Sequence, residues 1–355
     1  MMTVFLVVVI ALALLLQKLM VGKDLELIEA DHRPDAQIVE PDEPFHVQIS
    51  LKNKSRRMIP FLRVRENFEQ GIEPLECNEP RDGRGVCHVE FTTWLRSRQS
   101  LKRSIPVSIP SRGRYVLREF QLSTGDFLGL NEQSKTCGRF HEVVVAPKEL
   151  AVDRLNDMFG GFMGEVSVNR FIMEDPVLTL GYREYTGREP MKMISWAQSA
   201  RTGDLMVKKY DYTLEPTVSV VLNVDTRQPD REELLEICFS LARTVCAMLE
   251  QRGVKYSFTS NSILAGASAD SGATSEGLGQ RHFMGVLEHL GRATDACKVS
   301  MERLLEKEAD RGTADGRILI TPGGEDEPVR AVNRLREASG GNLLVLRAGE
   351  VASWC

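Results

Sequence analysis

The second half of the chain alternates short apolar segments with amphipathic ones, and this alternation limits the possible folds more than any other feature. Residues 217–224 (TVSVVLNV) are almost entirely apolar, which predicts a strand buried on both faces. A helix is predicted from Asp230, because Glu233 follows three residues later as in a capping box. Its apolar face is formed by residues at helical spacing, namely Leu234, Ile237, Cys238, Leu241, Val245 and Leu249. Strands that alternate with helices form a parallel sheet with crossover connections.

The remaining segments continue this pattern to the end of the chain. Further strands are predicted at 256–259, 317–321 and 342–346, and helices at 281–291, 294–309 and 328–338. Residues 261–280 are rich in Gly, Ser and Ala and predict a loop. Together with a possible strand from the region around residues 181–210, these segments predict a small doubly wound α/β domain. Such sheets place their ligand sites at the carboxyl ends of the strands.

The first half of the chain has a different period. Short segments with period-two alternation are separated by turn residues, and the predicted strands are 45–51, 59–64, 87–93, 100–109, 113–123 and 142–145. This spacing indicates an antiparallel β-sandwich over residues 24–147. Residues 148–180 have no clear period and include a stretch rich in Gly and Met at 157–164, which predicts a flexible connection. The fold class is therefore α+β multidomain, with the α/β domain at 181–355.

The N-terminus predicts a membrane anchor. Residues 1–16 carry no charge, and residues 1–22 could cross a hydrocarbon core of about 30 Å, with Lys18 reaching the interface. A cleaved signal peptide is the alternative, but neither a basic start nor an Ala-x-Ala site is present. Lys18 and Lys23 follow the apolar segment, so we expect a single-pass protein of the cell membrane whose bulk faces the cytoplasm.

Several classes of function have no support in the residues. Six histidines lack HExxH spacing, and no GxSxG elbow or Walker A lysine occurs, so we expect no enzyme. A net charge of -5 argues against a nucleic-acid partner. Seven scattered cysteines show no zinc spacing, and Cys238 and Cys246 are predicted core residues. Cys77 and Cys87 could bridge a hairpin if the body were outside the cell.

A dense polar motif precedes the buried strand. Residues 181–210 read GYREYTGREPMKMISWAQSARTGDLMVKKY. They resemble the signature REY-x-x-G-D-x-x-R-x-I-D-W-x-x-S-A-R of the bacterial family called "domain of unknown function 58". The signature residues in this chain are Arg183, Glu184, Tyr185, Glu189, Trp196, Ser199 and Arg201. The chain departs from the pattern at Arg188, Lys192 and Ser195, where the family has Gly, Arg and Asp. Residues 112–130 also resemble a segment of that family's sandwich.

The resemblance implies both a fold and a partnership. In that family the signature precedes a von Willebrand factor type A-like domain. Its members are often associated with a MoxR-type AAA+ ATPase. The expected function is therefore a membrane-anchored, non-enzymatic adaptor that works with such an ATPase in assembling or activating complexes of other membrane or cytoplasmic proteins.

The signature itself admits three interpretations. As an interface it would present Arg, Tyr and Trp, the residue types that contribute most to protein–protein binding. As a structural clasp it would pack Trp196 under a sheet and pair Arg183 and Arg201 with carboxylates such as Glu184. As a lipid-headgroup or phosphate site it would use its basic residues, Arg183, Arg188, Lys192, Arg201, Lys208 and Lys209.

A metal site is expected only in degenerate form. In von Willebrand type A domains the first strand ends in D-x-S-x-S, and a later loop adds a threonine to an oxygen cage for Mg²⁺. Here Asp225 is followed by Arg227 and Pro229 at the two serine positions. Asp225, Thr226 and Thr321 remain as the degenerate site, and we expect no cofactor. The alternative function, an extracytoplasmic metal-dependent adhesion or ligand-binding module, would need an intact motif and an exported body.

Overall fold

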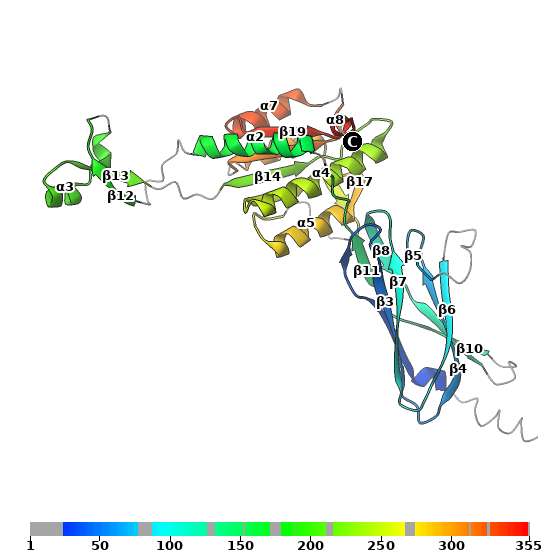
Figure 1. The fold of residues 1–355 in the computed structure, drawn as a ribbon. Helices are drawn as coiled ribbons and strands as arrows, with labels where there is room; N and C mark the ends of the chain where they lie inside the picture. Colours follow the sequence, from blue (N-terminus) through cyan, green and yellow to red (C-terminus); the bar gives the residue numbers. More distant parts are fainter. Residues whose placement is uncertain are drawn as a thin grey trace, which may run out of the picture. The chain divides into compact units, whose positions relative to one another are not determined.

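The structure, a computed structural model, describes residues 24–76, 87–125, 132–151, 153–170, 179–187, 189–210, 216–266, 274–311, 314–324 and 327–353. The predicted anchor at 1–22 lies outside these residues, and so do Cys77 and Arg188. The chain divides into two compact units, of which one comprises residues 1–148 with 287–292 and the other residues 149–286 with 293–355. Both can be followed in Figure 1, and each is described by itself.

The first unit is a β-sandwich whose two larger sheets are antiparallel. One sheet has the order β1-β3-β7-β5, formed by Ile28–Pro34, Phe45–Asn53, Ser100–Ser108 and Glu73–Pro74. The second has the order β10-β9-β4-β6, formed by Glu132–Cys137, Phe120–Gly125, Ile59–Phe68 and Cys87–Leu95. A third sheet joins β2, β11 and β8, formed by Ile38–Val39, His141–Val145 and Gly113–Leu117. Among the described residues of this unit, β2 is the one strand that pairs in parallel, with β11. A 3-10 helix, η1 (Asp24–Leu27), precedes β1.

The period of two places apolar side chains inside the sandwich. Along β3, Phe45, Val47, Ile49 and Leu51 are buried, while His46, Gln48 and Lys52 lie on the other face. Residues of both large sheets belong to one hydrophobic cluster, so the antiparallel sandwich predicted from the sequence is the observed fold of this unit.

A buried polar pair lies within this apolar core. The Nδ1 atom of His32 is 3.0 Å from Oε1 of Glu66, both side chains are fully buried, and Nε2 of His32 donates to the Arg139 carbonyl at 2.9 Å. Burial alone would lower the pKa of His32, but Glu66 and the Arg139 carbonyl raise it above its usual value. Burial raises the pKa of Glu66 as well, against the opposing effect of His32. The pair therefore holds its protons more tightly when the protein is folded.

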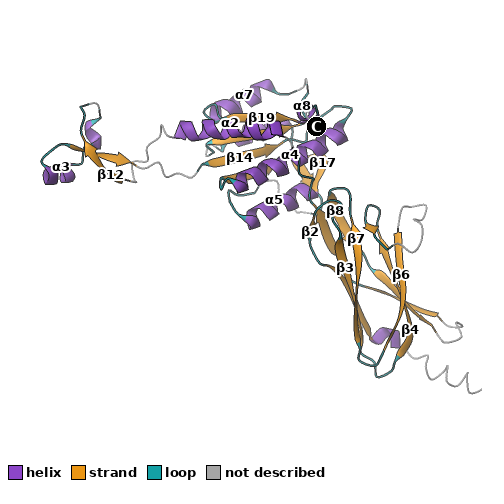
Figure 2. Ribbon diagram, in the orientation of Figure 1, coloured by secondary structure: helices purple, strands orange, loops and turns teal. Residues whose placement is uncertain are grey.

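The second unit contains a four-stranded parallel sheet with the order β15-β14-β18-β19, formed by Lys255–Ser260, Thr217–Leu222, Gly316–Thr321 and Leu343–Arg347. The central strand β14 is buried along its length after Thr217. Helices α6 (Met301–Asp310) and α7 (Val329–Ala338) pack on Val221 and Leu319. Helix α4 (Arg231–Gln251) packs against the sheet and against α8 (Ala348–Ala352), and Figure 2 shows helices on both sides of the strands.

Several predicted details differ from the structure. Asp230 is the N-cap of α4, but no side-chain cap hydrogen bond forms, so the capping box is absent. The helix ends as predicted near Gly253, whose φ of 67° is left-handed. The segment 294–309 is not one helix, because β17 (Ala293–Cys297) precedes α6 and pairs with β16 (Ser262–Leu264). Helix α5 (Gln280–Arg292) lies where a helix was predicted.

The predicted flexible connection contains a helix. Residues Asp153–Arg170 form α2, whose side chains Leu155, Phe159, Phe162 and Val166 are buried. The guanidinium of Arg252 lies 4.6 Å from the centre of the Phe159 ring. Three glycines at 160, 161 and 164 weaken the helical pattern in the sequence, but aromatic burial outweighs their low propensity. The motif region likewise adds no strand to the parallel sheet, because its two strands pair with each other.

Two further findings concern membrane-spanning helices and the cysteines. Within the described part of the chain, no helix is both long and apolar enough to span a bilayer. Cys87 is disulfide-bonded, whereas Cys137, Cys238, Cys246 and Cys297 are free. Cys238 and Cys246 are buried in α4, as predicted for core residues.

The His32–Glu66 pair predicts a specific dependence of stability on pH. Both groups have folded pKa values above their unfolded values, so the stability that they contribute is greatest in acid and is lost as the pH rises through the folded values. We therefore expect the His32→Gln/Glu66→Gln double variant to lose more stability, relative to the wild type, at pH 5 than at pH 8. Urea denaturation at both pH values measures the difference, and a larger loss at pH 8 would contradict the assignment.

Candidate functional site

The signature residues form a small hairpin. Strand β12 (Thr179–Glu184) pairs antiparallel with β13 (Met206–Tyr210), with Arg183 opposite Val207 and Glu184 opposite Met206. Between the strands come η2 (Met191–Met193) and α3 (Trp196–Thr202). Ile194 forms a bridge with Val207, and both are buried, so this motif has a small apolar centre of its own.

Glu189 organises the turn after β12. Its carboxylate accepts hydrogen bonds from the backbone N–H of Thr186 at 3.1 Å and from the Thr186 hydroxyl at 2.8 Å, and it pairs with Arg183 at 2.5 Å. These contacts lower the pKa of Glu189 to about 2, and the hydrogen bond from the Thr186 hydroxyl contributes most. The carboxylate therefore stays ionised at any physiological pH, and the turn keeps its geometry.

Ser199 joins α3 to the hairpin. Its hydroxyl donates to the Ser195 carbonyl at 2.9 Å and accepts from the N–H of Met206 at 2.8 Å. The N–H of Ser195 also donates to the Met206 carbonyl at 2.8 Å. Helix α3 ends at Gly203, whose φ of 86° is left-handed and whose N–H donates to the Ser199 carbonyl at 3.0 Å. Ser199 is therefore a structural residue of the motif.

The aromatic signature side chain points to solvent. Trp196 is 63% exposed, and Tyr182, Met191 and Leu205 are also large apolar side chains with exposed surface. The structure agrees with the clasp interpretation only in part. Arg183 pairs with a carboxylate, that of Glu189, whereas the side chain of Trp196 is exposed and not packed under a sheet. Four charged residues of the motif are also exposed, namely Arg183, Glu184, Lys192 and Arg201. Tyr185 is half-buried.

The second candidate site lies at the carboxyl ends of the parallel strands. A cavity of about 740 Å³ opens at the ends of β14 and β18, where the chain order of the sheet reverses. The three residues of the predicted degenerate site, Asp225, Thr226 and Thr321, all line it. Arg227, Gln228, Ser300, Met301, Glu302 and Glu327 also contribute to the lining.

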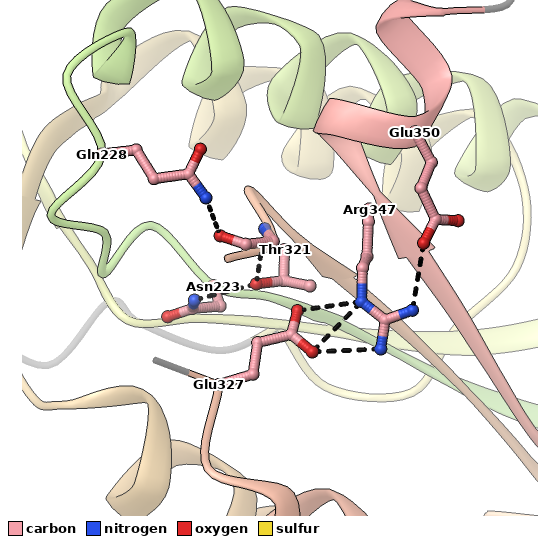
Figure 3. A network of polar contacts seen from close by, with 7 residues as sticks. Asn223, Gln228, Thr321, Glu327, Arg347 and Glu350 are labelled. Carbon is pink, nitrogen blue, oxygen red and sulfur yellow. Dashed lines mark hydrogen bonds and ion pairs between the residues drawn. The ribbon is translucent and has the colours of Figure 1, made fainter. Parts of the chain in front are cut away.

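Amide side chains cross-link the loops beneath this cavity. Asn223 donates through Nδ2 to the Thr321 hydroxyl oxygen at 3.2 Å and accepts through Oδ1 from Nδ2 of Asn261 at 2.9 Å. The Asp225 N–H also donates to Oδ1 of Asn223, at 3.0 Å. Figure 3 shows Asn223 and Thr321 in contact. Both asparagines are fully buried, so they join the ends of three strands in one network.

A further set of contacts borders the cavity. Gln228 donates to the Gly323 carbonyl, and the guanidinium of Arg347 pairs with Glu327 at 3.0 Å and with Glu350 at 3.3 Å (Figure 3). Hydrogen bonding to Glu327 raises the pKa of Arg347 above its usual value. No sequence pattern indicated these residues. Among the polar residues at this edge, only Asn223, two residues before Asp225, could have been found from its position in the sequence.

The residues present do not fit a magnesium site. The Thr321 hydroxyl oxygen accepts hydrogen bonds from Asn223 and, at 3.5 Å, from the Gly323 N–H, which leaves no lone pair for a metal. Oδ2 of Asp225 accepts from the N–H of Met301 at 3.2 Å, at the start of α6. Arg227 adds a positive charge to the cavity wall. Among the described residues, no group of three or more His, Cys, Asp or Glu side chains could hold a metal ion.

Comparisons with known proteins add only distant likenesses of fold. No protein-family model matches the chain, and no curated protein matches it. The crystal structure of the CARDB domain of the PF1109 protein from Pyrococcus furiosus, solved with di-metal ions, is 12% identical, with a TM-score of 0.23; the match covers 33% of this chain and 91% of that one. A cohesin module from a Clostridium perfringens family 33 glycoside hydrolase is 10% identical, with the same TM-score of 0.23. The match covers 34% of this chain and 96% of that module.

Asp225 is expected to act as a helix cap and not as a metal ligand. Replacing it by Ala removes the acceptor for the first N–H of α6, which should cost about 1 kcal/mol of unfolding free energy. Neither MgCl2 nor EDTA should shift the melting temperature of the wild type. Thermal unfolding of both proteins with each additive measures this, and a Mg²⁺-dependent rise in the wild type that the variant lacks would contradict it.

Proposed function

We propose that this chain is a membrane-anchored, non-enzymatic adaptor that belongs to the "domain of unknown function 58" family and works with a MoxR-type AAA+ ATPase. In this proposal it helps to assemble or activate complexes of other membrane or cytoplasmic proteins. The observation that carries the proposal is the division of the signature residues. Glu189 and Ser199 have their polar atoms within the motif, whereas Trp196 and Arg201 are exposed.

Such a division is what a recognition surface requires. An exposed tryptophan contributes nothing to the core of the motif, yet it can bury a large area against a partner. The hydrogen bonds of Glu189 and Ser199 fix the backbone on both sides of it, so little conformational entropy is lost on binding. Tyr182 and Met191 extend the apolar surface, and Lys192 and Arg201 add charge.

The proposal places residues 1–22 across the cell membrane and the rest of the chain in the cytoplasm. An AAA+ ATPase uses ATP, so the surface that binds it must lie on the cytoplasmic side. Lys18 and Lys23 after the apolar segment favour this orientation. The proposal assigns no covalent chemistry to the chain. It gives the cavity at the sheet edge no binding role.

A pull-down from native membranes tests the adaptor function. Detergent-solubilised wild type should recover an AAA+ ATPase in a nucleotide-dependent manner, and Trp196→Ala should reduce the recovery at least about tenfold, as for a hot-spot residue worth roughly 1.4 kcal/mol or more. Phe140→Ala is the matched control, because Phe140 of the sandwich unit is an aromatic side chain with a similar exposed fraction, 64%. Equal recovery by all three proteins, or no ATPase at all, would refute the proposal.

A second candidate function is favoured by the disulfide. Disulfides persist in oxidising compartments, so the bonded Cys87 favours an exported body and hence an extracytoplasmic ligand-binding module. The cavity at the sheet edge would then be the ligand site. Its residues do not fit the metal-dependent form of this function, so the candidate is kept only as a metal-independent binding module.

Cys297 allows the two candidates to be separated. Its thiol is free and exposed, so a membrane-impermeant maleimide should label it in broken cells but not in intact cells or spheroplasts if the body faces the cytoplasm. A Cys297→Ser variant identifies the labelled position by mass spectrometry. Labelling of Cys297 in intact spheroplasts would place the body outside and favour the second candidate.

A further inference from the structure

Three segments meet at one end of the β-sandwich. The chain enters there through η1, and Ile28 pairs with Asn53 at the end of β3. The turn after β3 lies against this entry, because the N–H of Lys54 donates to the Leu27 carbonyl at 3.0 Å. The turn between β6 and β7 joins them, since Nδ2 of Asn53 donates to the Arg96 carbonyl at 2.9 Å. This place is called the entry end below, and Figure 2 shows the short helix η1 near the turns of the sandwich.

The entry end is basic. Six exposed cationic side chains lie on the two turns and the strand ends beside them, namely Lys52, Lys54, Arg56, Arg57, Arg96 and Arg98. The acidic residues of the entering segment are fewer, and one of them, Glu29, pairs with Lys54. The whole chain has a net charge of -5, so this concentration of positive charge is local. A local positive field of this kind attracts an anionic surface.

Apolar side chains accompany the basic ones. Leu27, the last residue of η1, and Met58, just before β4, are about half exposed, at 48% and 49%. Trp94, near the end of β6, is also 49% exposed, and the guanidinium of Arg96 lies 5.3 Å from the centre of its ring. Basic residues that surround exposed leucine, methionine and tryptophan side chains are typical of surfaces that insert at the headgroup level of a bilayer.

The tip of one turn keeps a cation at a conformational cost. Arg98 has a φ of 58°, a left-handed conformation that glycine and asparagine adopt more easily than arginine. The turn would therefore form more easily with Gly at this position. An arginine there is consistent with a role in binding, and it allows a variant that removes the charge without harming the fold.

We propose that the entry end docks on the anionic lipid surface of the membrane, through phosphate headgroups that contact the six cations. The occupant is a bilayer because residues 1–22, the apolar segment of the proposed anchor, directly precede η1 in the sequence. A chain anchored by that segment holds the entry end close to the headgroups, where each basic side chain gains attraction to anionic lipid. The inference rests in this respect on the proposed anchor, whereas the basic turns and apolar tips come from the sandwich itself.

Hydrogen exchange of the full chain in nanodiscs tests the docking. The probes are nanodiscs of phosphatidylcholine alone and nanodiscs that also contain phosphatidylglycerol. Peptides that cover residues 52–58 and 95–99 should exchange about tenfold more slowly in the anionic discs. The Arg56→Gln/Arg98→Gly variant should lose this protection, and its second substitution removes a strained backbone position, so the fold is kept. The control variant is Arg330→Gln/Arg336→Gln, which removes the same number of positive charges from the exposed face of α7. It should behave as wild type.

Each other outcome overturns a defined part of the inference. Equal exchange in both kinds of disc, or equal loss in the control variant, would refute docking on anionic lipid. Protection by soluble heparin but not by phosphatidylglycerol would assign the entry end to a different polyanion and would also refute it. A chain that does not incorporate into discs would refute the anchor alone. Exchange measured with phosphatidylglycerol vesicles would then still decide whether the entry end binds lipid.

Discussion

The parallel pairing of β14 on both of its edges is the constraint on which the α/β unit depends. Val218 to Leu222 align residue by residue with β15 on one side and with β18 on the other. Because all three strands run in the same direction, the loops that follow them open at one edge of the sheet. Residues 38 and 98 positions from Asn223, namely Asn261 and Thr321, are brought to its side chain. A shift of register would break the asparagine network and the contact of Asp225 with α6.

The sequence predicted those parts of the fold that depend on local pattern. The sandwich strands have a clear period of two, and β14 and β18 are apolar runs, so the order of elements could be inferred. Helix α2 could not, because its glycines weaken the helical pattern, and burial of side chains such as Phe159 and Phe162 stabilises it. Only some of the residues around the cavity could be predicted. Asp225 follows β14 and Thr321 ends β18, and both were predicted. Arg347 borders the cavity through an ion pair with Glu327 that no local pattern indicates.

The roles of the signature residues could likewise be predicted only in part. Its residue types indicated recognition, but the sequence could not separate side chains that build the hairpin from those that remain available. The hydroxyl of Ser199 connects α3 to β13, and the carboxylate of Glu189 holds the turn. These roles depend on distances between residues, not on their spacing. Once these two are assigned to the fold, Trp196 stands out as a large side chain with no structural role in the contacts described.

The hydrogen bonds of Thr321 have a consequence for any attempt to re-engineer the sheet edge. Its oxygen accepts from Asn223 and Gly323, so the hydroxyl has only its proton left to offer to a ligand. Replacing Arg227 and Pro229 by serine would complete the D-x-S-x-S motif in the sequence. The coordination sphere would still lack its threonine, because the amide of Asn223 would have to release that oxygen first. The obstacles to a metal ion at this sheet edge therefore lie in the buried network beneath the cavity as well as in the loop above it.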